Sequence, residues 1–238
     1  MIDVHSYIIN PDDDAEFSRL MEDMTTNHID YRVISVKRDD SNIANYKAVT
    51  KLCSRSPKLL GCAFINPRRD DALTTVRMCV KDPSIRMFEF DSYYNGYYPE
   101  RQENLKELFQ TIAETDKPIK VFVGLGAYSI PQQWELWAER YPSIPFIFLH
   151  MGCFDYGYTC IDVVQRNDNI YTESSNQYEL QILRKAAKNL DVSKILFGTT
   201  YPHRLSSSGI LVFDMTDWDD EQKEKIFNNG KKLLKIEC

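Results

Sequence analysis

The stretch Ile2-Asp3-Val4-His5-Ser6-Tyr7-Ile8, at the start of the chain, has the residue pattern of a β-strand. In an extended strand, side chains two residues apart point to the same side, so His5 and Tyr7 share one face. A histidine beside a tyrosine near the end of a first strand suggests functional residues. What they could do depends on the fold that surrounds this strand.

Seven more strand-like runs follow, most of them rich in the β-branched and aromatic residues that strands prefer. They span 31–36, 59–65, 85–90, 119–123, 145–149, 169–173 and 194–198. Charged stretches with helical spacing lie between them, and one has its apolar residues at i, i+3, i+4 and i+7, at Phe17, Leu20, Met21 and Met24. The stretch 155–168 has the thinnest apolar pattern among the expected helices.

Eight strands, each followed by a helix or a loop, match the plan of a (β/α)8 barrel. A doubly wound sheet is the weaker alternative, because no GxGxxG follows the first strand and the chain contains no GxxxxGK[ST]. We therefore predict an α/β fold, a compact (β/α)8 TIM-type barrel with some short or degenerate helices, forming a single domain over residues 1–238.

The composition narrows the class of protein. Lys plus Arg number 29 and Asp plus Glu 35, a net charge of −6, so there is no basic excess for general nucleic-acid binding. The N-terminus lacks a signal-peptide pattern, and apolar runs such as 145–149 are too short to span a membrane. The six cysteines form no CxxC pair. We expect a cytoplasmic protein with mostly reduced thiols and no nucleic-acid or membrane partner.

In a barrel of this type, chemistry belongs at the C-terminal ends of the strands. The residues that the expected strands bring toward that end are His5, Tyr7, Asn66, Arg86, Glu89, Gly124, Gly126, His150, Glu173, Thr200, Tyr201 and His203. Strand alternation puts Glu89 on the face opposite Arg86, so the two are not expected to line the pocket together.

Three of these strand ends carry motifs. Ile2-Asp3-Val4-His5-Ser6-Tyr7 is similar to I-D-x-H-x-H, Phe148-Leu149-His150-Met151-Gly152 to a strand ending in His and Met-Gly, and Gly198-Thr199-Thr200-Tyr201-Pro202 to G-T-D-Y-P. Together they resemble the amidohydrolase-related (amidohydrolase 2) family of metal-dependent barrel hydrolases and decarboxylases. The likeness runs over most of the chain.

The resemblance also implies a metal site that this chain has lost. The family's ion is commonly held by both histidines of H-x-H, a histidine after strand 5 and the Asp of G-T-D. These positions hold His5, Tyr7, Gly124 and Thr200 here. A divalent ion that activates water needs three or more protein donors, and a tyrosine with a pKa near 10 is a poor one. We therefore expect no metal and no other cofactor.

The remaining polar residues suggest roles. His150 can act as acid or base near neutral pH, with His5 and Glu173 completing the catalytic set. A purely structural role is the alternative for each of them.

Candidate substrate-binding residues are Tyr7, Arg86, Glu89, Thr200 and Tyr201. In the family a basic residue near Arg86 could hold a substrate carboxylate. If Glu89 enters the barrel, burial is expected to raise its pKa, and Tyr7 could simply fill the space of the lost metal.

Three functions stay open. The favoured one is a metal-independent hydrolase, or a related addition–elimination enzyme, acting on a small carboxylate-bearing substrate. The second is a noncatalytic pseudoenzyme that binds a small molecule or a partner. The third is a metal-dependent hydrolase rebuilt from His5, His150 and either Glu89 or Glu173. The aromatic content leaves room for a homodimer.

Overall fold

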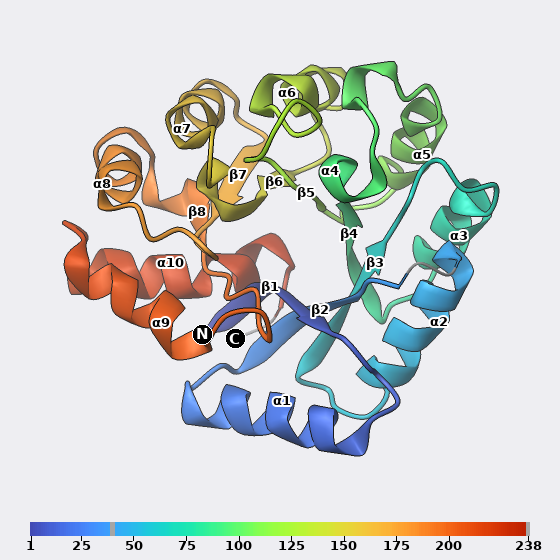
Figure 1. The fold of residues 1–238 in the computed structure, drawn as a ribbon, viewed down its shortest axis with the longest axis horizontal. Helices are drawn as coiled ribbons and strands as arrows, with labels where there is room; N and C mark the ends of the chain where they lie inside the picture. The colour runs from blue at the N-terminus through green and yellow to red at the C-terminus, as the bar shows by residue number, and fades with distance from the viewer. Residues whose placement is uncertain (39–40, 237–238) are drawn as a thin grey trace.

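The structure is a computed structural model and describes residues 1–38 and 41–236. Eight parallel strands pair in sequence order, and helices surround them (Figure 1). The strands are β1 (Ile2–Ile8), β2 (Tyr31–Val36), β3 (Leu59–Phe64), β4 (Ile85–Phe90), β5 (Ile119–Val121), β6 (Phe146–Phe148), β7 (Ile170–Glu173) and β8 (Ile195–Leu196).

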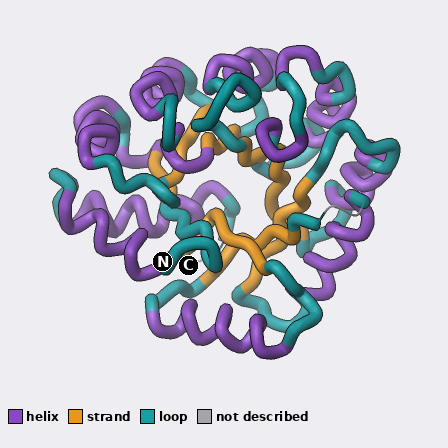
Figure 2. The backbone as a smooth tube through the Cα atoms, viewed as in Figure 1, coloured by secondary structure: helices purple, strands orange, loops and turns teal. Residues whose placement is uncertain are grey.

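Hydrogen bonds between the last and the first strand bring the two edges of the sheet together. The N–H of Val4 donates to the carbonyl of Phe197 at 2.9 Å, and the N–H of Thr200 donates to the carbonyl of His5 at 2.8 Å. The strands therefore form a ring inside a ring of helices (Figure 2), and the predicted (β/α)8 barrel is confirmed. The first, second and fourth strands have the predicted bounds, whereas β5, β6 and β8 are shorter than predicted.

The α-helices are α1 (Asp14–Thr26), α2 (Asn42–Cys53), α3 (Ala72–Cys79), α4 (Ser92–Asn95), α5 (Leu105–Ile112), α6 (Pro131–Arg140), α7 (Gly157–Arg166), α8 (Leu180–Asn189), α9 (Ser206–Leu211) and α10 (Asp220–Leu233). The 3₁₀ helices are η1 (Pro99–Arg101), η2 (Leu149–Gly152), η3 (Val192–Lys194) and η4 (Val212–Met215). The weakly patterned stretch 155–168 does contain a helix, α7, because Cys160, Ile161, Val163 and Val164 give it a buried face.

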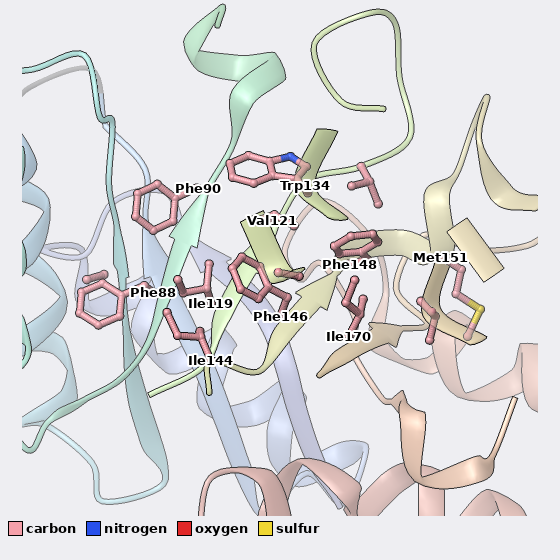
Figure 3. Close-up of a cluster of buried hydrophobic side chains, with 14 of the residues drawn as sticks. Phe88, Phe90, Ile119, Val121, Trp134, Ile144, Phe146, Phe148, Met151 and Ile170 are labelled. Carbon is pink, nitrogen blue, oxygen red and sulfur yellow. The ribbon is translucent and has the colours of Figure 1, made fainter. Parts of the chain in front are cut away.

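The main apolar core lies between the strands and the helices. Alternate strand residues point outward into it, and Figure 3 shows part of this layer around β4, β5 and β6, including Phe88, Val121 and Phe148. All three side chains are fully buried. Burying one large apolar side chain of this kind contributes about 1.5–3 kcal/mol.

A second, smaller apolar cluster fills the lower half of the barrel interior, at the N-terminal end of the strands. It consists of Ile2, Val4, Val33, Cys62, Met87, Ile147, Leu196 and Leu234. The end of α10 closes the barrel below it, and a Cβ at Gly230 would lie 2.6 Å from the Val4 side chain. This apolar plug leaves only the C-terminal end of the barrel for polar chemistry.

The described cysteines, Cys53, Cys62, Cys79, Cys153 and Cys160, are free thiols. Burial raises the pKa of the Cys62 thiol to about 12, so it remains protonated. Cys238 lies outside the described residues. In the part of the chain that the structure describes, no helix combines the length and the apolar character needed to cross a bilayer.

Candidate functional site

Four buried polar side chains meet above the apolar plug, and we call them the barrel-centre ring: His5 and Tyr7 on β1, Glu89 on β4 and Lys120 on β5. The Lys120 Nζ lies 3.1 Å from His5 Nδ1 and 3.2 Å from Glu89 Oε2. The Tyr7 hydroxyl donates to Glu89 Oε1 at 2.7 Å and lies 3.3 Å from His5 Nε2. A further donor, the Ser35 hydroxyl, reaches Glu89 Oε2 at 2.5 Å.

A β-bulge brings His5 into this ring. The register between β1 and β2 shifts by one residue between Asp3 and Ser6. Asp3 therefore faces the outer helices, where it pairs with Arg32 at 2.9 Å, while Tyr7 faces the interior opposite Ser35. His5 and Tyr7 share the interior face, as strand alternation predicts. The bulge explains why the adjacent Val4 also faces the interior, whereas Asp3 faces outward.

The ring is an ion pair inside a barrel. Burial by itself would raise the pKa of Glu89, but the Lys120 and Lys37 ammonium groups, with hydrogen bonds from Ser35 and Tyr7, lower it below its ordinary value. Burial opposes the charge of Lys120, yet the charge of the Glu89 carboxylate and its hydrogen bond with Lys120 raise the pKa of Lys120. The expectation of a raised pKa at Glu89 was wrong, because a cation that the sequence analysis missed lies next to it.

Burial and the neighbouring Lys120 hold the pKa of His5 well below its ordinary value, so His5 is neutral. Burial and the nearby Glu89 raise the pKa of Tyr7 well above 10. The ring therefore carries one full positive charge, one full negative charge and two neutral groups at pH 7.

A second cluster, the His150 relay, comprises His150 in η2 with Glu173 and Ser175 at the end of β7. Glu173 accepts hydrogen bonds from the backbone N–H of His150 at 2.6 Å and from the Ser175 hydroxyl at 2.8 Å. His150 Nδ1 lies 3.1 Å from the Ser175 carbonyl oxygen and 2.8 Å from its hydroxyl. His150 adopts a φ of 63°, a conformation that non-glycine residues rarely use. The bond from its N–H to Glu173 helps to hold it there.

No lysine forms an ion pair with the relay among the described residues, and the pKa values of His150 and Glu173 shift in opposite directions. Burial lowers the pKa of His150 to about 4. Burial also raises the pKa of Glu173 to about 7, although hydrogen bonds from His150 and Ser175 act against that rise. At neutral pH the imidazole is therefore uncharged, and Glu173 titrates close to neutral pH.

A cavity of about 430 Å³ opens above both clusters, within the usual range for small-molecule sites. Its lining is Tyr7, Ile8, Ile9, Lys37, Asp91, Tyr94, Phe122, His150, Thr200 and His203. The Lys37 Nζ pairs with Asp91 at 2.5 Å and lies 4.1 Å from the centre of the Tyr94 ring. Aromatic walls, one ammonium group paired with a carboxylate, and two imidazoles therefore surround this space.

Thr200 contributes an unsatisfied group to this cavity. Its side-chain hydroxyl is buried, and within residues 1–38 and 41–236 it has no hydrogen-bond partner. Its backbone is held at a φ of 57°. A buried hydroxyl without a partner costs about 1–3 kcal/mol, which a bound ligand could recover.

The structure brings together six of the predicted site residues and leaves two elsewhere. His5, Tyr7 and Glu89 lie in the ring, His150 and Glu173 in the relay, and Thr200 lines the cavity. Arg86 lies near the beginning of β4, at the closed end of the barrel, where its guanidinium donates to the carbonyl of Leu234. The Tyr201 ring packs outside the barrel, 4.8 Å from the Arg32 guanidinium carbon.

Sequence reasoning missed two lysines and one wall residue, Lys120, Lys37 and Phe122. Lys120 interrupts the apolar run 119–123, and strand alternation places it on the same face as Phe122. A single lysine within an otherwise apolar strand could have indicated a buried, paired cation. Lys37 directly follows β2, where the rule about strand ends would have found it. His203, predicted near the end of the last strand, lines the cavity with its ring 5.6 Å from the Tyr7 ring.

The residues at the barrel centre do not fit the divalent ion that the resemblance implies. The Lys120 ammonium faces His5, and Tyr7 and Thr200 offer only hydroxyl groups. Gly124 has a φ of 142°, and a Cβ there would lie 1.8 Å from the Cys153 carbonyl oxygen, so no side chain fits. Across the described residues, no three His, Cys, Asp or Glu side chains are grouped to hold a metal. The geometry gives no support to a site rebuilt from His5, His150 and a glutamate.

Comparison with known proteins points to one family. A family model described as Amidohydrolase matches residues 2–235. No curated protein matches the chain. Among solved structures, 5-carboxyvanillate decarboxylase from Sphingomonas paucimobilis is similar with a TM-score of 0.77 at 12% identity, covering 100% of this chain and 99% of that one.

Two dihydroxybenzoate decarboxylases are also similar in fold. The enzyme from Polaromonas sp. JS666, solved with manganese and the inhibitor 2-nitroresorcinol, has a TM-score of 0.72 at 14% identity, covering 99% of this chain and 96% of that one. The 2,6-dihydroxybenzoate decarboxylase from Rhizobium has a TM-score of 0.72 at 14% identity, covering 99% and 98%. At these identities the likeness shows a shared fold.

Proposed function

The chain belongs to the amidohydrolase family, and on that premise we propose that it is a metal-independent hydrolase of a small carboxylate-bearing ester or lactone, with His150 as its general base. One observation carries the proposal. His150 lines the cavity while its Nδ1 is engaged by Ser175, which leaves Nε2 as the ring nitrogen available to a substrate or a water molecule.

Proton positions in the relay support this role. The Ser175 carbonyl can only accept a hydrogen bond, so the neutral imidazole carries its proton on Nδ1 and a lone pair on Nε2. Nε2 would take a proton from water as the water oxygen bonds to the substrate carbonyl carbon. The proton would then pass to the leaving oxygen as the carbon–oxygen bond breaks.

Glu173 supports the histidine through Ser175. An imidazole with a pKa of about 4 is uncharged at pH 7, so its Nε2 lone pair is free, but it is a weak proton acceptor. A negative charge on Glu173, whose Oε1 lies 3.5 Å from His150 Nδ1, would stabilise the imidazolium that forms during the reaction. Activity should therefore rise with pH as Glu173 ionises around pH 7.

The cavity walls suggest how the substrate binds. We assign the role of anchor for a substrate carboxylate to Lys37 and not to Arg86, because the Lys37 ammonium group lines the cavity beside Tyr94. The unpaired Thr200 hydroxyl is available to a substrate oxygen. Tyr7 and Phe122 provide the apolar surfaces.

Binding without turnover is the second candidate, and one observation favours it. His5 and Glu89 are fully buried beneath the cavity and already bonded within the barrel-centre ring, so these two predicted site residues are engaged before any ligand binds. In that case the cavity would hold a small acid that the protein does not change.

The two functions can be separated with a panel of small esters and lactones that carry a carboxylate. We expect hydrolysis by the unchanged protein and a loss of about 10²–10⁴-fold in kcat for His150→Gln. His28→Asn is the matched control, because His28 lies away from the cavity with a φ of 55° that asparagine tolerates.

Turnover that survives in His150→Gln would contradict the assigned base. Ligands that raise the melting temperature of the unchanged protein but are never hydrolysed would overturn the hydrolase proposal and support the binding function.

A further inference from the structure

The barrel-centre ring is a closed circuit of four contacts, and chemistry allows its protons only one arrangement. The Lys120 ammonium has donors only, and an ionised Glu89 has acceptors only. Lys120 contacts Glu89 Oε2 at 3.2 Å and His5 Nδ1 at 3.1 Å. His5 Nδ1 must therefore be an acceptor, since a proton there would face an ammonium proton.

The remaining protons follow from this first assignment. A neutral His5 that accepts at Nδ1 carries its proton on Nε2, which lies 3.3 Å from the Tyr7 oxygen. Tyr7 can accept that bond, because its own proton goes to Glu89 Oε1 at 2.7 Å. Each group in the circuit then has a partner for every polar atom that faces the ring.

The neighbouring imidazole has the opposite proton arrangement. His150 Nδ1 faces a carbonyl oxygen and so carries the proton, as described above. The rings of His5 and His150 lie 5.1 Å apart between centroids, edge to face. Two neutral histidines in contact are thus expected to hold different tautomers, each set by the group that faces its Nδ1.

We propose that the Lys120 ammonium is the resident cation of the barrel centre, engaging the His5 lone pair and the Glu89 carboxylate so that the centre does not bind a divalent metal ion. Both nitrogens of His5 are then in use, and both oxygens of Glu89 are occupied. Lys120 and Glu89 act as positioning residues that hold Tyr7 as the floor of the cavity. This inference does not depend on whether the cavity supports turnover.

The tautomers can be read directly from the unchanged protein by ¹⁵N NMR of the imidazole rings at neutral pH. The chain has four histidines, and His28→Asn and His203→Gln identify the signals of the two outside the clusters. We expect one buried histidine protonated on Nε2, for His5, and the other on Nδ1, for His150. The same tautomer in both, or a charged His5, would overturn the proposal.

Metal content provides an independent readout. Protein purified without chelator, incubated with Mn²⁺ or Zn²⁺ and then desalted, should retain well below one ion per chain. Its melting temperature should not change with either ion. Retention of about one ion per chain, lost in His5→Ala, would overturn the proposal whatever the activity.

A paired variant tests the positioning role of Lys120. Lys120→Met with Glu89→Gln removes both charges together, so it avoids leaving one buried charge alone. We expect His5 to lose its single tautomer in this variant, while His150 keeps its own. A His5 tautomer unchanged from the parent protein would show that Lys120 does not set it and would contradict the inference.

Discussion

The barrel-centre ring and the His150 relay lie side by side and contain similar parts, yet they differ in charge and in access. Each has one histidine, one glutamate and at least one hydroxyl group, and their two imidazoles are 5.1 Å apart. The ring is charged, fully bonded and covered by Tyr7. Between about pH 4 and pH 7 both the His150 imidazole and the Glu173 carboxyl group are mostly neutral, and the relay presents a free ring nitrogen to the cavity.

This difference shows that residue type does not assign a role to a buried glutamate. Lys120, which forms a direct ion pair with Glu89, lowers the pKa of that carboxyl group. Glu173 forms no ion pair with a lysine among the described residues, and burial raises its pKa to about 7. One lysine therefore separates a structural ion pair from a group that titrates near neutral pH.

The largest expected effect on stability comes from a substitution that breaks the ion pair of the barrel-centre ring. Lys120→Met leaves the Glu89 carboxylate buried with no direct cation, and it should lower the free energy of unfolding by about 3–5 kcal/mol. Urea denaturation followed by circular dichroism measures the change. Adding Glu89→Gln should recover more than half of the loss, because the unpaired charge is then gone.

A fully additive pair of substitutions would show that Lys120 and Glu89 do not interact energetically. Glu107→Gln serves as a matched control, since Glu107 forms an exposed pair with Arg77. Its stability change should stay within about 0.5 kcal/mol.

The next largest effect is the pH dependence of stability that Glu173 and His150 give to the relay. Glu173, with its pKa raised by burial to about 7 from 4.5, stabilises the fold below pH 4.5 and loses this contribution as pH rises to 7. His150, with its pKa lowered by burial from 6.5 to about 4, contributes above pH 6.5 and loses this as pH falls to 4. Each contribution to the free energy of unfolding is about 3 kcal/mol. Between about pH 4.5 and 6.5 the Glu173 contribution falls with rising pH while the His150 contribution grows, so the two oppose each other.

Removing one partner should expose the slope of the other. We expect the stability of Glu173→Gln, relative to the unchanged protein, to increase with pH between about 4.5 and 6.5. The relative stability of His150→Gln should decrease over the same interval. Urea denaturation at three pH values tests both, and parallel profiles for all three proteins would refute the opposed titrations.

The smallest effect concerns the cavity wall. Thr200→Val keeps the shape and removes a hydroxyl that has no partner among the described residues. The free energy of unfolding should therefore stay the same or rise by up to about 1 kcal/mol. Affinity for a carboxylate-bearing ligand should fall about tenfold, measured by calorimetry. A clear loss of stability would mean that the hydroxyl is already bonded in the free protein.

Most of the fold was predictable because the signals are local and repeated. The strands predicted at 31–36 and 85–90 have the same bounds in the structure, because their β-branched and aromatic residues favour an extended backbone along the whole run. The ends of β5, β6 and β8 were not predictable. There the chain leaves the ladder while the sequence remains apolar, and tertiary contacts decide where pairing stops.

The placement of the candidate site residues in the fold was predictable, but their electrostatic environment was not. The strand ends pointed to His5, His150 and Glu173, and all three lie at the open end of the barrel. The state of Glu89 could not be inferred, because it depends on Lys120, a residue distant in sequence. The prediction for Arg86 was wrong because Arg86 lies near the beginning of β4. It is three residues before Glu89, which places it about 10 Å closer to the closed end of the barrel.

Gly124 has a consequence for how this protein could change over generations. A Cβ at that position would meet the Cys153 carbonyl at 1.8 Å, so a side chain could return only if the neighbouring loop moved first. A histidine at residue 124 would then disrupt folding before it could offer a metal ligand. Acquiring that ligand would require a second, simultaneous change in the loop that carries Cys153.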